Sequence, residues 1–235
     1  HAILHLLYAR FWTRALARIG KVEVKEPFAS LFTQGMVTHE TYSRAQGEGL
    51  PPLFFTPDEI ARTADGATLE ADGAPVDVGR VIKMSKSKKN VVDPDAILDQ
   101  YGADAVRWFM LSDSPPERDL PWSEAGIEGA WRFINRLWRL SETSEAAQGS
   151  DIPLDRKLHQ TIAAIGANIE ALAFNKAVAN IYELANAIEK APPSASRAEA
   201  VAVMMRLVAP MVPHVAEEAW AAAGHAGLVA DAAWP

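Results

Sequence analysis

Lysine and serine side chains are concentrated in the five residues Lys83-Met84-Ser85-Lys86-Ser87. Two ammonium groups, together with backbone N–H groups, can stabilise the negative charge that develops on phosphate oxygens during phosphoryl or nucleotidyl transfer. Lysine suits this chemistry because its ammonium is a compact and mobile point charge. The segment therefore predicts a polyphosphate-binding loop, and the alternative is a solvated basic turn.

A second basic region contains Arg132, Arg136 and Arg139, with no acidic residue between Glu128 and Glu142. At about 100° per residue, the three arginines fall within an arc of about 60° on one helix. The chain has a formal charge of −7, so any contact with nucleic acid must come from such local patches. We predict contact with RNA phosphates here, and a solvated helix face or internal salt bridges are the alternatives.

The elements that would position these residues are predicted from hydrophobic periodicity and turn residues. An opening helix extends to Ile19 and stops at Gly20, and residues 31–42 and 53–82 have the pattern of short strands and hairpins. Asp93-Pro94 has the pattern of a helix N-cap and first turn, and a second short helix covers residues 103–111.

Amphipathic helices are predicted over the rest of the chain. One covers residues 122–140, where we expect Trp131, Phe133 and Trp138 to pack in the core. Two stripes of apolar residues over 155–190 change phase at Ala173-Phe174, so a kink or turn is expected there. A further stripe stops at Pro210, and a last helix extends from Pro213 to Gly224, which together predict an antiparallel bundle.

Composition excludes several classes of protein. No apolar run approaches the roughly 18 residues that span a bilayer, and the absence of cysteine excludes disulfides and thiolate-ligated zinc. We expect a cytoplasmic protein with no membrane or DNA partner and no bound structural metal. His1 and His5, four residues apart on one predicted helix, share a face, and such a pair is more often a surface feature than a site.

The lysine and serine segment resembles the KMSKS signature of class I aminoacyl-tRNA synthetases at every position. The resemblance implies that Lys83 and Lys86 hold the phosphates of ATP and stabilise departing pyrophosphate, with Mg²⁺ on the phosphates. It also implies that Val81 and Ile82 lie near the adenine. Met84, Ser85 and Ser87 would then shape the loop.

Four longer stretches are similar to the bacterial-type leucine enzyme of this class: residues 1–11, 31–37, 93–107 and 116–140. This likeness implies leucine and its tRNA as substrates, His1 and His5 beside the leucine pocket, and tRNA backbone contacts from Arg132, Arg136 and Arg139. The isoleucine and valine enzymes, which share the KMSKS region, are the alternative.

The predicted fold is therefore an α/β remnant of a Rossmann-like catalytic domain with a small β insert and the KMSKS loop, over residues 1–121. An all-α helical bundle that binds tRNA follows over residues 122–235. The first class I signature is absent from the sequence, and no capping residue precedes the opening helix. We therefore expect part of a longer enzyme, inactive in isolation. A non-catalytic tRNA-binding module and a helical interaction module are the rival interpretations.

Overall fold

A computed structural model describes residues 2–64, 66–142 and 148–235. Its internal contacts divide the chain into two units, His1–Gln34 and Gly35–Pro235. No helix in these described ranges is both long enough and apolar enough to cross a membrane.

The first unit is built on one continuous helical segment. A π-helix over Ala2–Ala9 continues as α1 (Arg10–Arg18), and Gly20 follows with a φ of 73°, the left-handed conformation typical of a helix stop. The predicted opening helix and its end are confirmed. The Arg10 guanidinium donates two hydrogen bonds to Glu26, of 2.7 and 2.9 Å, and so ties the helix to the segment that follows it.

The second unit begins with two small sheets. A three-stranded sheet has the order β7-β1-β8, in which β1 pairs antiparallel with β7 and parallel with β8. A five-stranded antiparallel sheet has the order β3-β2-β6-β5-β4. The strands are β1 (Val37–His39), β2 (Tyr42–Arg44), β3 (Leu53–Phe55), β4 (Ile60–Thr63), β5 (Gly66–Leu69), β6 (Pro75–Val78), β7 (Ile82–Lys83) and β8 (Leu120–Pro121).

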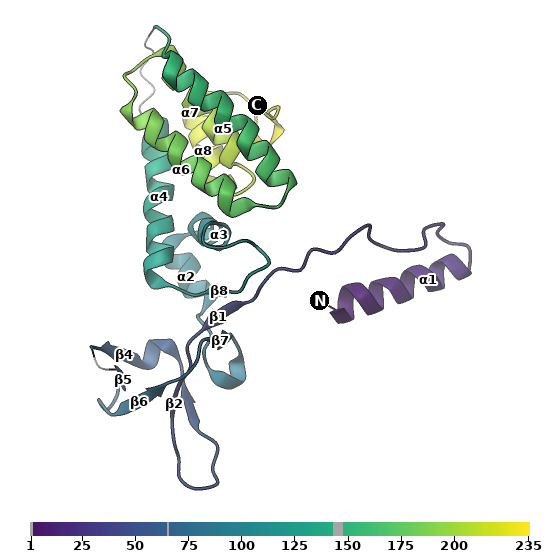
Figure 1. Cartoon of the computed structure of the whole chain (residues 1–235), viewed down its shortest axis with the longest axis vertical. Helices are drawn as coiled ribbons and strands as arrows, with labels where there is room; N and C mark the ends of the chain where they lie inside the picture. Colours follow the sequence, from purple (N-terminus) through teal and green to yellow (C-terminus); the bar gives the residue numbers. More distant parts are fainter. Residues whose placement is uncertain (1, 65, 143–147) are drawn as a thin grey trace. The chain divides into compact units, whose positions relative to one another are not determined.

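Helices make up the rest of this unit, and α4 to α8 pack together as the bundle drawn in teal to yellow in Figure 1. The helices are α2 (Pro94–Tyr101), α3 (Ala103–Ser112), α4 (Glu124–Glu142), α5 (Ile152–Glu170), α6 (Phe174–Lys190), α7 (Ala195–Val208) and α8 (Pro213–Ala222). The turn predicted at Ala173-Phe174 is confirmed, because α5 ends at Glu170 and Leu172 adopts a left-handed φ of 55°.

Two hydrophobic cores hold this unit together. A small one under the five-stranded sheet contains Tyr42, Phe55, Ala67 and Val76. The large one is continuous from Ile97 in α2 to the C-terminal helices, and it includes residues on both sides of position 121. The domain boundary between 121 and 122 stays a prediction, and packing is continuous across it.

The prediction of strands over residues 31–42 was too broad, because only β1 and the start of β2 form there. The surroundings of Gly35 explain part of the difference between the predicted and the observed strands. A Cβ on Gly35 would lie 1.9 Å from the carbonyl oxygen of Arg118, and the Gly35 N–H donates to Pro116 at 2.9 Å. The chain at this point packs against a loop rather than pairing with a strand. Asp119 continues the contact by accepting a hydrogen bond from the N–H of Met36.

Candidate functional site

The lysine loop is attached to the central strand of the three-stranded sheet. Lys83, in β7, is paired with Thr38 in β1, and the N–H of Met84 donates to the carbonyl of Val37 at 3.1 Å. The chain then turns through a 3₁₀ helix over Lys86–Lys88. Lys83 and Lys86 are both exposed. The strand thus fixes the start of the loop while its two ammonium groups stay in solvent.

Asn90 fixes the other end of the loop, and sequence reasoning missed it. Its side chain is completely buried. The side-chain oxygen accepts from the N–H of Ser85 at 2.9 Å, and the amide nitrogen donates to the carbonyls of His39, Ile82 and Lys83 at 3.1 to 3.4 Å. A buried amide with these partners closes the loop into a fixed shape. Its only signal in the sequence is an uncharged polar residue after a basic run.

The backbone of the loop is largely occupied by its own hydrogen bonds. The N–H groups of Met84 and Ser85 bind Val37 and Asn90, and those of Lys88 and Lys89 bind the carbonyls of Ser85 and Lys86. The hydroxyls of Ser85 and Ser87 lie 2.8 Å apart. These four N–H groups therefore have partners within the fold, whereas no hydrogen bond or ion pair of the described residues occupies the ammonium groups of Lys83 and Lys86.

The neighbouring lysines have partners in the β insert. The ammonium of Lys88 lies 4.3 Å from the centre of the Phe54 ring, a cation–π contact. Hydrogen bonds from Thr56 lower the pKa of Glu59, and the charge of Lys89 lowers it further. Among the residues that the structure describes, no ion pair involves Lys83 or Lys86.

The remaining predicted loop residues have different environments. Val81 and Ile82 are exposed by 50% and 38%, so apolar surface is open on the strand before the loop. Met84 is half-buried and lines an apolar cavity of about 220 Å³ whose other walls come from β1, α2, α3 and Trp122. The side chain of Met84 thus packs on the side of the loop that faces α2 and α3.

The two predicted pocket histidines belong to the first unit. His1 lies outside the described residues, so the shared face of the pair is not tested. His5 is half-buried, and its ring lies 5.8 Å from that of Phe28.

A third histidine, His39 in β1, was not predicted as a site residue. Burial lowers the pKa of His39, the charge of Glu124 opposes this, and the charge of Arg62 adds to it.

The three arginines of α4 do not form one equivalent set. Arg136 donates to both carboxylate oxygens of Glu189 at 2.7 and 2.9 Å and to Asn186 at 2.7 Å, with a side chain that is 20% exposed. It therefore joins α4 to α6, which is the internal salt bridge weighed as an alternative. Arg132 is 65% exposed and lies 3.7 Å from Glu128, and Arg139 is also exposed.

The aromatic residues beside these arginines also differ from one another. Phe133 is buried, and Trp138 is half-buried against the core, as expected. Trp131 is 42% exposed, so the expectation that it packs in the core was wrong. The reason is its position on the helix: it precedes the buried Phe133 by two residues, about 200° around α4.

The described residues contain no group of three or more histidine, cysteine or carboxylate side chains placed to hold a metal ion. No acidic residue occurs between Asp77 and Asp93. Magnesium prefers oxygen ligands, and the lysine loop offers no carboxylate for it.

Two family models match this chain. Residues 76–123, which contain the lysine loop, Asn90, α2 and α3, match the tRNA synthetases class I (I, L, M and V). Residues 152–235, which contain α5 to α8, match the anticodon-binding domain of tRNA ligase. The arginines of α4 lie between the two matched regions.

Similar proteins extend the match over the whole chain. The leucine–tRNA ligases of Sphingopyxis alaskensis, Novosphingobium aromaticivorans and Zymomonas mobilis are 76%, 71% and 61% identical to it, each over 100% of the chain. The chain is a partial sequence of the leucine–tRNA ligase family. It spans only 27–28% of the length of these relatives.

A solved member of this leucine–tRNA ligase family has the same fold. The crystal structure of the ternary complex of Agrobacterium radiobacter K84 LeuRS with tRNA and LeuAMS matches 100% of this chain and 27% of that one, with a TM-score of 0.70 and 30% identity. The mixed α/β region with small sheets, followed by a helical anticodon-binding region, is thus also the fold of the matching part of that enzyme. The identities of 61–76% to leucine–tRNA ligases favour the leucine interpretation over the isoleucine and valine alternatives.

Proposed function

We propose that this chain supplies the KMSKS half of the ATP site and the RNA-docking helices of an enzyme that joins leucine to its tRNA. The reaction passes through leucyl-adenylate and uses ATP. In this proposal the β1–β7–β8 sheet with α2 and α3 is the remnant of a Rossmann-like catalytic domain. The described residues contain one parallel strand pair, β1 with β8, as support for such an assignment.

The observation that carries the proposal is the contrast between the fixed backbone and the exposed lysines of the loop. Asn90 and β1 hold the main chain, whereas Lys83 and Lys86 are exposed and have no ion pair among the residues described. Such preorganised cations stabilise charge in a transition state at little cost in reorganisation. A merely solvated turn would not need a buried amide to fix its shape.

In the proposed activation step, a carboxylate oxygen of leucine bonds to the α-phosphorus of ATP as the bond to the pyrophosphate oxygen breaks. The electron pair of that bond leaves with pyrophosphate. The ammonium groups of Lys83 and Lys86 stabilise this charge, while Val81 and Ile82 lie against the adenine and Met84, Ser85 and Ser87 keep the loop shape. Because the loop has no carboxylate that could bind Mg²⁺, this ion would be bound by the phosphate oxygens of ATP. It would neutralise part of their charge.

The other substrates are assigned to other parts of the chain. His1 and His5 of the opening helix are proposed to line the leucine pocket, and the exposed Arg132 and Arg139 to contact phosphates of the tRNA. Arg136 is assigned instead to the α4–α6 junction, because Glu189 and Asn186 occupy its guanidinium. Backbone contacts of this kind position RNA without reading its sequence.

The test uses the leucine–tRNA ligase of Sphingopyxis alaskensis in which the matching segment is replaced by this chain, called here the chimeric ligase. Leucine-dependent ATP–pyrophosphate exchange is measured for Lys83→Ala and Lys86→Ala. Removing one preorganised donor costs about 10²–10³ in rate, so we expect a fall of that order in kcat with little change in the KM for leucine. Lys176→Ala, which removes an exposed lysine from α6, is the matched control.

An active chimeric ligase with a defect confined to the loop variants supports the proposal. A chimeric ligase that neither activates nor transfers leucine, although it folds, contradicts it. Equal rates for the loop variants and the Lys176→Ala control would remove the catalytic role of the lysines.

A further inference from the structure

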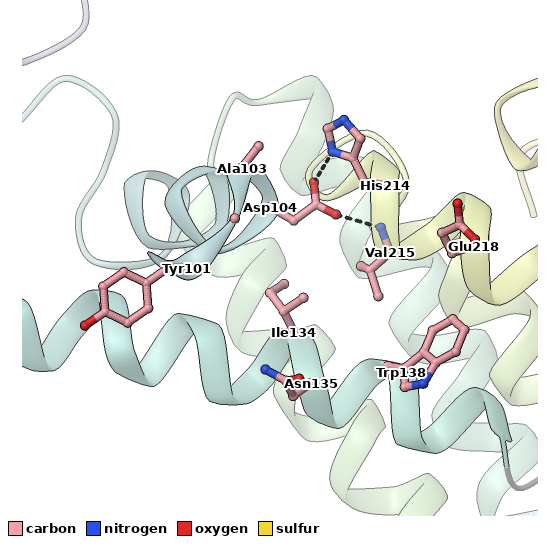
Figure 2. A pocket seen from close by; sticks show the side chains of 10 residues that line it. Tyr101, Ala103, Asp104, Ile134, Asn135, Trp138, His214, Val215 and Glu218 are labelled. Carbon is pink, nitrogen blue, oxygen red and sulfur yellow. Dashed lines mark hydrogen bonds and ion pairs between the residues drawn. The ribbon is translucent and has the colours of Figure 1, made fainter. Parts of the chain in front are cut away.

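Helix α3 makes polar contacts with the start of α8 and with the turn that precedes it, across more than 100 positions of sequence. Asp104, in the first turn of α3, is only 6% exposed. One of its carboxylate oxygens lies 2.8 Å from Nδ1 of His214, and the other accepts from the backbone N–H of Val215 at 2.7 Å. Figure 2 shows this carboxylate directed from α3 at both partners on α8.

Asp104 provides a hydrogen-bond acceptor for the first turn of α8, which the N-cap residue of α8 cannot provide. The residue at the N-cap of α8 is Val212, whose side chain cannot accept a hydrogen bond from the first turn. The first N–H groups of a helix need outside acceptors. Asp104 supplies one from α3, and a negative charge is also favourable at this end of a helix.

Arg107, one turn further along α3, binds the connection between α7 and α8. Its Nε donates to the carbonyl of Met211 at 2.8 Å, and its Nη2 donates to that of Pro210 at 3.0 Å. A planar guanidinium with two fixed donors can define both the position and the rotation of this turn. Asp104 and Arg107 therefore hold the start of α8 and the turn that precedes it at two points.

Trp108, four residues after Asp104 and so on nearly the same face of α3, embeds this helix in the bundle core. Trp108 is completely buried, its ring stacks on Phe133 at 4.9 Å, and its indole N–H donates to the hydroxyl of Tyr182 at 3.0 Å. Helix α3 is thus fixed to α4 and α6 by packing and to α8 by hydrogen bonds. The chain between Asn90 and α3 is only α2 and its flanking residues, so a short segment links the lysine loop to the bundle.

We propose that Asp104 and Arg107 are positioning residues that set the orientation of the RNA-docking bundle relative to the lysine loop, and so act on transfer of leucine to tRNA. This inference rests on the proposed function. Transfer requires the end of a tRNA, docked on the bundle, to meet an adenylate at the loop, and misplacement by about 1 Å can cost about 10²-fold in rate. Activation does not use the bundle and should not depend on this connection.

The experiment compares Asp104→Asn in the chimeric ligase with Asp99→Asn, an exposed position in α2 that changes the same charge. An asparagine keeps an acceptor for Val215 but loses the charge that faces His214. We expect the single-turnover rate of transfer from preformed adenylate to tRNA to fall by about ten-fold. ATP–pyrophosphate exchange and the Kd for tRNA should match those of the control.

A second variant keeps the proposal testable if Asp104→Asn does not fold. Arg107→Lys keeps the charge but can reach one carbonyl instead of two, so it should give a smaller defect of the same kind. If Asp104→Asn loses helical circular dichroism, the Arg107→Lys result decides. A transfer rate equal to that of the Asp99→Asn control, or an equal loss of exchange and transfer, would overturn the positioning role. An unmutated chimeric ligase that cannot charge tRNA would instead overturn the proposed function.

Discussion

The two basic regions of this chain look alike in sequence and differ in structure. The loop lysines Lys83 and Lys86 are exposed, and within the described part of the chain neither has an acidic partner. In the arginine stretch of α4, Arg136 is held by Glu189, which lies 53 residues further along the chain. An acid-free window in the sequence therefore does not show whether its cations face solvent.

The difference follows from the supporting elements. A helix in a bundle has neighbours on most sides, so a cation on it can meet an acid from another helix. The loop is held by β1 and Asn90, and its lysines Lys83 and Lys86 are exposed. Arginines on a bundle helix can contribute to docking and to stability. Exposed lysines on a fixed loop can contact a charged substrate.

The largest effect expected outside the two lysines themselves comes from the base of the loop. Asn90→Ala would leave the N–H of Ser85 and three carbonyls without their partner, and an unsatisfied buried polar group costs about 1–3 kcal/mol. We expect leucine activation by the chimeric ligase to fall by about 10²-fold as the lysines lose their fixed position. Asn180→Ala, which removes only a local contact to Lys176 within α6, is the control and should activate leucine normally.

The next effect is on the salt dependence of tRNA affinity, which should distinguish the three arginines of α4. Each lost phosphate contact should make the slope of log affinity against log salt shallower by about 0.7–0.9. We expect this change for Arg132→Gln and for Arg139→Gln in tRNA binding by the chimeric ligase. Arg136→Gln should leave the slope unchanged, and a shallower slope for Arg136→Gln would show that RNA displaces Glu189.

Arg136 should instead affect the stability of the bundle. Its side chain is partly exposed, so we discount the ion pair for solvent and expect a loss of about 1 kcal/mol in Arg136→Gln. The measurement is hydrogen exchange of α6 amides in the chimeric ligase, which reports local opening. Arg132→Gln is the comparison, and equal protection of α6 in both variants would contradict the assigned junction.

The smallest effect concerns the strand under the loop. Burial lowers the pKa of His39, so the fold favours neutral histidine and contributes stability above the unfolded value of about 6.5. That stability is lost as the pH falls through this value. Hydrogen-exchange protection of β1 should therefore decline between about pH 7.5 and 5.5, and less so in His39→Gln. Glu124→Gln removes the opposing charge and should steepen the decline.

Local patterns predicted most of the helices and the lysine loop. Asp93 accepts a hydrogen bond from the N–H of Asp95 at the start of α2, as an N-cap before Pro94 should. Periodicity also located the break between α5 and α6. These features depend on residues within a few turns of one another, so the sequence contains the whole signal.

Contacts between distant segments could not be predicted in this way. The partners of Asn90 include His39, and the acceptor for Val215 is Asp104, 111 positions earlier. The parallel pairing of Val37 with Leu120 is equally remote. A single sequence holds no pattern that links such residues, because each pairing is decided by the packing of the whole unit.

One measurement tests most directly whether the lysine loop acts in catalysis and α4 acts in docking. Leucine-dependent ATP–pyrophosphate exchange without tRNA is compared for two double variants of the chimeric ligase, Lys83→Gln with Lys86→Gln and Arg132→Gln with Arg139→Gln. Each removes two positive charges. We expect the lysine pair to lose more than about 10²-fold, and the arginine pair to stay within about two-fold of the parent. Equal losses in the two double variants, or an unchanged rate in the lysine pair, would contradict the assignment of catalysis to the loop and docking to α4.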